Sequence, residues 1–205
     1  MIPNAKRNLH ECEYHLNKMI ESQNIEELEI NFAAFVNSAR NVTFVLQKEF
    51  NENKNFETWY KQKQEEMGND ELCTFFNELR NRIVKEGINQ VRCNTVINKF
   101  NSSTDVIDRP SGADLIIKSK GIYFLINSGT PQEDLIPAKT RVKIITTVFV
   151  ENAPKNHLGQ AIQNNNIIEI SRIYYSYLKN LVEEWTGIWQ QIHPSAKTKT
   201  RQKSA

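Results

Sequence analysis

The segment DELCTFFNELRNRIVKEG, residues 70–87, contains a full set of helix signals. Asp70 is a preferred N-cap residue, and Glu71 adds a second negative charge where the positive end of the helix dipole favours it. Apolar side chains recur at intervals of three and four residues, at Leu72, Phe75, Phe76, Leu79 and Ile83. Gly87 suits the left-handed conformation in which many helices end. The segment therefore predicts one amphipathic helix with a polar C-terminal part.

Two further amphipathic helices are expected before this segment, over about residues 4–22 and 24–50. The second begins with Asn24 and, three residues later, Glu27, which is the spacing of a capping box. Its apolar stripe consists of Leu28, Phe32, Phe35, Ala39, Val42, Leu46 and Phe50. Such a stripe packs inside a helical bundle or forms the seam of a coiled-coil dimer, and its bulky phenylalanines favour the bundle.

The aromatic residues Phe56, Trp59 and Tyr60 are expected on a short third helix that ends near Gly68. Such rings can stack on nucleic-acid bases. A nucleic-acid interface would surround them with Arg and Lys, and the sequence has no such run at this place. The rings are therefore expected to fill the core of the protein.

Beyond residue 87 the periodicity changes from that of a helix to that of strands. Residues 91–98 and 141–150 alternate between apolar and polar side chains, which is typical of half-buried strands. Two apolar runs, 115–117 and 122–126, flank a short polar segment with a glycine, which indicates a hairpin. We expect a small antiparallel sheet over about residues 88–150.

A last long helix is expected over about residues 164–192, with Asn166 and Glu169 as its cap pair. Its stripe consists of Ile170, Tyr174, Tyr177, Leu181, Trp185, Ile188 and Ile192. So large an apolar face needs the N-terminal helices as its partner. The sequence thus predicts an α+β fold, a bundle of about four main helices with a small antiparallel sheet inserted before the last helix. Residues 1–194 would form one composite domain, followed by a disordered basic tail at 195–205.

Composition limits the functions that this fold can serve. The net charge is +2, and four of the 26 basic residues lie in the tail, which leaves 22 basic against 24 acidic residues elsewhere. This balance argues against a basic nucleic-acid surface over the whole body but leaves room for a localised patch.

The chain has no secretory signal and no apolar run long enough to cross a bilayer, so we expect a cytoplasmic protein without a membrane partner. Cys12, Cys73 and Cys93 show neither a zinc-site spacing nor a disulfide pattern and are expected to be reduced, buried thiols.

Motifs for common chemistries are absent from the sequence, which has no glycine-rich phosphate loop and no His-Glu-x-x-His metal motif. His10 and His15 are five residues apart, which does not align them on one helical face. We therefore expect no metal and no cofactor. His157 follows Lys155 and Asn156 in a loop, where a ligand could reach it, although a loop histidine is more often structural or solvated.

The polar C-terminal part of segment 70–87 reads Arg80-Asn81-x-x-x-Lys85. Residues 81 and 85 are one helical turn apart and share a face. A bundle of about four helices with Arg-Asn-x-x-x-His near the end of the third resembles the HEPN superfamily (higher eukaryotes and prokaryotes nucleotide-binding). Together with Trp59-Tyr60 and the loop at 154–159, the motif resembles a divergent bacterial branch in which lysine replaces the motif histidine.

The resemblance implies a relative of the metal-independent ribonucleases of toxin and defence systems, which act as dimers. Arg80 then matches the motif arginine, Asn81 the polar residue that orients it, and Lys85 the motif histidine. These three residues become catalytic candidates of an endoribonuclease. Histidine is a good base near its pKa of about 6.5, whereas lysine, at about 10.4, is a poor base but can still donate to phosphate.

Three interpretations of the motif stay open at this point. Arg80 and Lys85, with Arg82 and His157 as further ligand-binding candidates, could clamp RNA or nucleotide phosphates without cutting. The motif could cleave RNA as a metal-independent endoribonuclease. It could also be a solvated helix face, with an Arg82–Glu86 ion pair, in a non-catalytic interaction or oligomerisation module.

Overall fold

Amide and carboxylate side chains cap the helices of this protein. The side-chain oxygens of Asn24, Asp70 and Asn166 accept backbone N–H groups of the first turns that follow them, as the sequence predicts. Asn53 caps a further helix in the same way. Gly87 ends its helix at a φ of 69°, in the left-handed region. Short-range chemistry therefore sets most of the helix boundaries.

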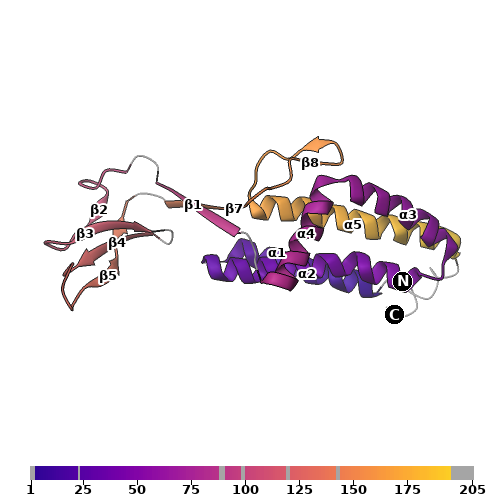
Figure 1. Ribbon diagram of the computed structural model, residues 1–205, viewed down its shortest axis with the longest axis horizontal. Coiled ribbons are helices and arrows are strands. Elements are labelled where there is room, and N and C mark those ends of the chain that lie inside the picture. The colour runs from indigo at the N-terminus through magenta and orange to yellow at the C-terminus, as the bar shows by residue number, and fades with distance from the viewer. Residues whose placement is uncertain are drawn as a thin grey trace, which may run out of the picture. The chain divides into compact units, whose positions relative to one another are not determined.

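The computed structural model describes residues 3–22, 24–87, 91–97, 100–118, 121–141 and 144–194. Its helices are α1 (Pro3–Glu21), α2 (Ile25–Phe50), α3 (Lys54–Asn69), α4 (Glu71–Glu86) and α5 (Ile167–Ile192) (Figure 1). Its strands are β1 (Val91–Ile97), β2 (Val106–Ile107), β3 (Asp114–Lys118), β4 (Gly121–Ile126), β5 (Asp134–Pro137), β6 (Lys139–Thr140), β7 (Ile144–Val150), β8 (Asn156–His157) and β9 (Gln160–Ala161). The fold is α+β, a helical bundle with small antiparallel sheets, which confirms the predicted class.

The chain divides into two compact units, Met1–Gln90 with Val150–Ala205 and Val91–Phe149. In sequence the second unit lies between α4 and α5, where the inserted sheet was expected. The sequence predicts that residues 1–194 form one composite domain. Whether the two units are held together in this way stays a prediction. The basic tail at 195–205 lies outside the described residues.

The helical unit buries the expected stripes inside one bundle. All seven stripe residues of α2 are buried, so the bundle interpretation is confirmed over the coiled-coil dimer. α5 packs on α1 and α2, as its large apolar face requires. The stripe of α5 ends earlier than expected, because Ile192 is 41% exposed. α4 runs across the bundle, steeply inclined to α2 and α5 (Figure 1).

The aromatic residues of α3 belong to the core. Phe56 and Tyr60 are buried, and their rings stack with centroids 5.0 Å apart. Trp59 stacks on the fully buried Trp185 of α5 at 5.3 Å, and its indole N–H donates to Glu184. These contacts confirm that the cluster fills the core and make base stacking unnecessary to explain it.

The second unit is built from short antiparallel pairings. β3 and β4 form the expected hairpin, with Ile117 opposite Ile122, and β5 adds a third strand on the other side of β4. β1 pairs with β7, and β2 pairs with β6. Strands β2, β5 and β6 are not predicted by the sequence pattern, since each has only two to four residues and too little alternation to be recognised.

Two further observations concern membrane insertion and the reactivity of the cysteines. None of the helices in the described ranges is both long and apolar enough to cross a membrane. Cys12 and Cys73 are buried free thiols, and burial raises the pKa of Cys12 to about 12 and also raises that of Cys73, so neither is poised to react. The side chain of Cys93 lies outside the part that is described.

Candidate functional site

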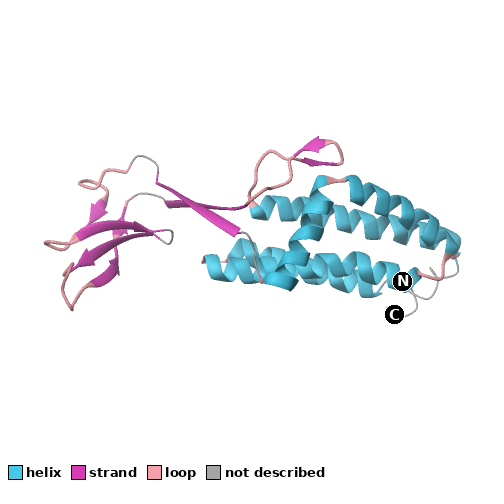
Figure 2. Cartoon of the chain, viewed as in Figure 1, coloured by secondary structure: helices cyan, strands magenta, loops and turns pink. Residues whose placement is uncertain are grey.

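Helix α4 carries all the motif candidates, and its two ends have different surroundings. At the N-terminal end, a short β hairpin formed by β8 and β9 packs against the helix (Figure 2). The motif of Arg80, Asn81 and Lys85 lies in the C-terminal half. From Asp70, the rise of an α-helix places Arg80 about 15 Å and Lys85 about 22 Å further along the axis.

Asp70 connects the hairpin to the helix. Its Oδ1 accepts the backbone N–H of Cys73 at 2.9 Å, which is the helix cap, and its Oδ2 accepts the backbone N–H of Leu158 at 2.7 Å. His157 Nδ1 lies 3.0 Å from Oδ1. Because an ionised carboxylate only accepts, Nδ1 carries the hydrogen in this contact. One buried side chain thus caps α4 and holds the hairpin.

These contacts determine the acidity of Asp70. Its burial would by itself raise the pKa, but the backbone N–H groups of Leu158 and Cys73 and the ring of His157 outweigh burial and hold the pKa below its usual range. The ionised form is therefore the one that the fold stabilises.

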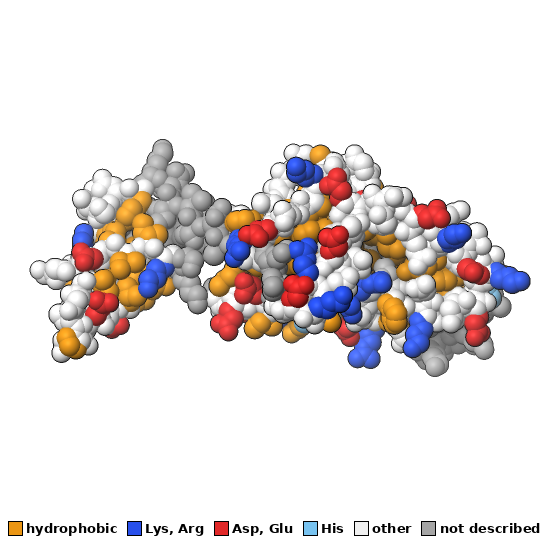
Figure 3. All heavy atoms as spheres, viewed as in Figure 1, with side chains coloured by type: hydrophobic (Ala, Val, Ile, Leu, Met, Phe, Trp, Pro, Cys, Tyr) orange, Lys and Arg blue, Asp and Glu red, His pale blue; other side chains and the backbone are white. Residues whose placement is uncertain are grey.

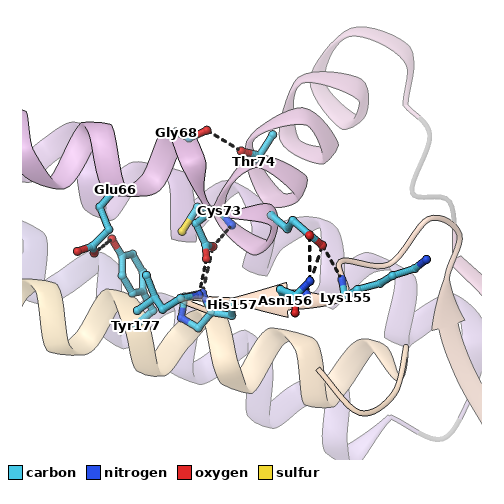
Figure 4. Close-up of polar contacts among 11 residues, drawn as sticks. Glu66, Gly68, Cys73, Thr74, Lys155, Asn156, His157 and Tyr177 are labelled. Carbon is cyan, nitrogen blue, oxygen red and sulfur yellow. Dashed lines mark hydrogen bonds and ion pairs between the residues drawn. The ribbon is translucent and has the colours of Figure 1, made fainter. Parts of the chain in front are cut away.

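Glu71, like Asp70, accepts hydrogen bonds from the segment that includes β8, but it lies at the surface. Its Oε2 accepts the backbone N–H groups of Lys155 at 2.9 Å and Asn156 at 3.3 Å, and its Oε1 accepts the Asn156 side-chain amide at 3.1 Å. The Asn156 amide and the Lys155 N–H lower the pKa of Glu71. Figure 4 shows Lys155 and Asn156 beside the start of α4.

The hairpin turn is strained where it meets Asp70. Leu158 and Gly159, the two residues between β8 and β9, have φ values of 48° and 77°. Two positive φ values are what a type I′ turn requires, and glycine or asparagine usually occupies such positions. A leucine there carries a steric cost of about 1–2 kcal/mol. The hydrogen bond from its N–H to Asp70 helps to hold this conformation.

A polar junction extends from this contact into the bundle. The His157 ring meets Tyr177 edge-on at 5.2 Å, and the Tyr177 hydroxyl donates to Glu66 at 3.1 Å (Figure 4). Helices α3 and α5 are therefore joined to the hairpin through side chains.

The same junction places three potential metal ligands together. Atoms of Asp70, Cys73 and His157 lie within 4.8 Å of one another. Both Asp70 oxygens already accept hydrogen bonds, and burial and the Asp70 charge raise the pKa of the Cys73 thiol, which keeps it protonated. A metal would need a thiolate and a free carboxylate oxygen, so the donor set suits a hydrogen-bonded junction better than a metal centre. No local sequence pattern predicts this cluster, because Asp70 and His157 are 87 residues apart.

The motif residues Arg80 and Lys85 differ from Asp70 and Glu71 in their polar partners. Arg80 is half-buried, and its Nη1 donates to the side-chain oxygen of its neighbour Asn81 at 3.4 Å. Lys85 is exposed. Within the described ranges, neither Arg80 nor Lys85 forms an ion pair with a carboxylate. Their positive charges are therefore available to an external anion.

Arg82 has a mixed environment. Its Nη2 lies 3.9 Å from Glu78, a long ion pair that replaces the expected pairing with Glu86. Arg82 lines a hollow of about 660 Å³ between α4 and residues 152–155, which Glu71 and Glu78 also line. The acidic side chains weaken the attraction of this hollow for anions.

The structure brings Arg80, Asn81 and Lys85 to one stretch of α4 and places His157 at the opposite end. His157 contacts Asp70 and Tyr177, and its side chain is only 14% exposed. The sequence predicts a loop where the structure has the β8–β9 hairpin, because Leu158 is not a residue that a type I′ turn favours and only Gly159 signals a turn.

Comparison with known proteins gives one family. Residues 2–184 match the family described as bacteriophage lambda protein ea47. No curated protein matches the chain, and no solved structure matches it. Because the match spans well over half of the 205 residues, the chain belongs to the bacteriophage lambda protein ea47 family.

Proposed function

We propose that the C-terminal half of α4 binds phosphate groups of RNA or nucleotides, in a cytoplasmic HEPN-like protein related to toxin and defence ribonucleases. The observation that carries this proposal is the contrast in charge pairing along one helix. Asp70 and Glu71 are held by groups of the protein itself, whereas Arg80 and Lys85 have no carboxylate partner among the described residues.

Helical geometry allows Arg80 and Lys85 to act together. Five residues correspond to a rise of about 7.5 Å and a net rotation of about 140°, so the two side chains leave different faces of α4, and their length lets them contact two neighbouring phosphates of one strand. Asn81 accepts from Arg80 and can orient the guanidinium, which is the role that the resemblance implies. Acidic and basic side chains are interspersed over the visible face of the helical unit, which fits a local clamp rather than a broad basic surface (Figure 3).

The arrangement supports binding better than cleavage. Cleavage through a 2′-hydroxyl needs a base that is neutral near pH 7, and a lysine becomes one through burial. Lys85 is exposed and lacks that burial. The proposal is therefore a phosphate clamp on a degenerate ribonuclease site that uses no metal.

Fluorescence anisotropy with a labelled single-stranded RNA tests the clamp. Arg80→Ala should weaken binding about tenfold to a hundredfold, which is the effect of losing one charged donor. Arg7→Ala is the matched control, since Arg7 is an exposed helical arginine on α1. Thermal melts of each variant verify folding. Unaltered RNA binding by a destabilised Arg80→Ala would contradict the clamp.

Lys85→His tests the relation to ribonucleases. The substitution restores the residue that the resemblance implies, so metal-independent RNA cleavage should appear or rise in the presence of a chelator. Absence of cleavage, with RNA binding retained, would restrict the proposal to binding alone.

An interaction or oligomerisation module is the second candidate, and exposed apolar residues favour it. Ile30 and Phe44 on α2 are 63% and 56% exposed, and Val84 on α4 is 56% exposed. Sedimentation velocity across a concentration series would detect a homodimer. If Val84→Lys abolished the dimer while RNA failed to bind the wild type, this candidate would replace the clamp.

A further inference from the structure

A second cationic feature lies in the bundle, in a hollow of about 280 Å³ between α2, α3 and α4. The polar residues that line it include Arg40, Thr43, Gln47, Tyr60, Gln64, Thr74, Asn77 and, from α5, Tyr174. None of the described residues that line it is an aspartate or a glutamate. The hollow thus has one formal positive charge among neutral groups.

Arg40 has no counter-charge among the residues that the structure describes. The residue is half-buried, and its Nη1 donates to the Thr43 hydroxyl at 2.7 Å. Within the described part of the chain no carboxylate pairs with it. A guanidinium has five N–H donors, so most of them remain for a ligand. Partly burying a charge without a partner is unfavourable, and a bound anion would remove that cost.

The groups around Arg40 are fixed by the core. Tyr60 is buried, and its hydroxyl donates to the backbone oxygen of Thr43 at 3.2 Å. Burial raises the pKa of Tyr60, and the nearby positive charge of Arg40 opposes that increase. Thr43 is itself buried and donates to the backbone oxygen of Arg40. This wall is therefore pre-formed.

Neutral hydrogen-bonding groups complete the hollow. The side-chain amides of Gln47, Gln64 and Asn77 can donate to or accept from an uncharged part of a ligand. Ligand pockets in proteins combine such a few polar groups with an apolar lining, and their volumes begin near 300 Å³. The size suits a small organic molecule and exceeds what a bare oxyanion fills.

We propose that this hollow binds a small organic anion, whose phosphate or carboxylate group is held by the Arg40 guanidinium. A planar guanidinium can pair with two oxygens of either group, so the two ligand types share this chemistry. The inference does not rest on the RNA-binding proposal, because Arg40 lies on α2 and the Arg80–Lys85 motif lies on α4.

Isothermal titration calorimetry at constant ionic strength in chloride buffer tests the proposal. The probes are adenosine monophosphate, succinate and inorganic phosphate, each up to about 10 mM. We expect saturable binding of adenosine monophosphate or succinate that exceeds that of inorganic phosphate, and the stronger probe identifies the anionic group. Arg40→Gln should weaken this binding about tenfold or more, whereas Arg7→Gln should change it less than about threefold.

A second variant keeps the test valid if Arg40→Gln does not fold. Asn77 is exposed, so Asn77→Asp should fold, and its new negative charge should repel the anion and weaken binding. If Arg80→Ala weakened the binding of adenosine monophosphate and Arg40→Gln did not, the nucleotide would be bound at the proposed clamp on α4, and the present proposal would be overturned. The proposal is overturned if neither organic probe saturates the wild type, or if Asn77→Asp binds it as tightly as the wild type does.

Discussion

The two ends of α4 differ in how their charges are used. At the N-terminal end, both oxygens of Asp70 and both oxygens of Glu71 accept hydrogen bonds from the protein, mostly from the β8–β9 hairpin. At the C-terminal end, the side chain of Arg80 hydrogen-bonds only to its neighbour Asn81 among the described residues, and Lys85 is exposed. The comparison indicates that one end holds the fold together and the other end is available to a ligand.

The largest effect on stability should come from Asp70→Ala. The substitution removes the cap of α4 and leaves the N–H of Leu158 without its acceptor, so the free energy of unfolding should fall by about 3 kcal/mol. Urea denaturation measures this change. Glu65→Ala, at an exposed position of α3, should change stability by less than about 0.5 kcal/mol. Equal effects of the two variants would remove the distinction on which the comparison depends.

The pH dependence of stability gives a second effect. The folded state lowers the pKa of Asp70, so the ionised carboxylate contributes stability that is present above the unfolded pKa of about 4 and is lost as pH falls through the folded pKa. Asp70→Asn cannot ionise and lacks this contribution. The difference in unfolding free energy between wild type and Asp70→Asn should therefore shrink from pH 7 to pH 3. A difference that stays constant would show that the charge of Asp70 is not what the hairpin recognises.

A smaller and opposite effect is expected at the turn of the hairpin. Leu158→Asn should raise stability by about 1 kcal/mol, because asparagine followed by glycine is preferred in a type I′ turn. Leu158→Ala is the matched control, since it removes the same apolar side chain but lacks the side-chain amide with which asparagine stabilises a left-handed backbone. The control should not be stabilised. If both variants gained equally, relief of backbone strain would not be the cause.

The smallest effect on stability is expected for Arg80→Ala. With no carboxylate partner to lose among the described residues, the change in unfolding free energy should stay within about 0.5 kcal/mol in the same urea experiment. A loss comparable to that of Asp70→Ala would make Arg80 a structural residue and would favour the interaction-module alternative.

The helices could be predicted from the sequence because their signals are local. Asn24, Asp70 and Asn166 cap helices through backbone groups two or three residues away, and each cap could be read from the residue and its successors. The stripe of α2 was likewise correct in full, whereas the stripe of α5 was extended too far to Ile192.

The surroundings of the candidate site could not be predicted in the same way. The docking of His157 on Asp70 joins residues 87 positions apart, and no local pattern specifies which helix a hairpin contacts. Whether Arg40 or Arg80 has a carboxylate partner depends on residues that are close in space but distant in sequence, and among the described residues neither has one. The motif itself was visible in sequence, but only the structure shows that His157 is separated from it.

The salt dependence of RNA binding tests the central claim most directly. For single-stranded RNA, log K falls with log salt concentration by about 0.7 per phosphate contact. If Arg80 and Lys85 each contact phosphate, Arg80→Gln/Lys85→Gln should give a slope shallower than that of the wild type by about 1.4, while Arg7→Gln/Lys61→Gln should leave it unchanged. A slope that is the same for the wild type and both double variants would contradict the account, because the charges at the C-terminal end of α4 would then make no contact with RNA.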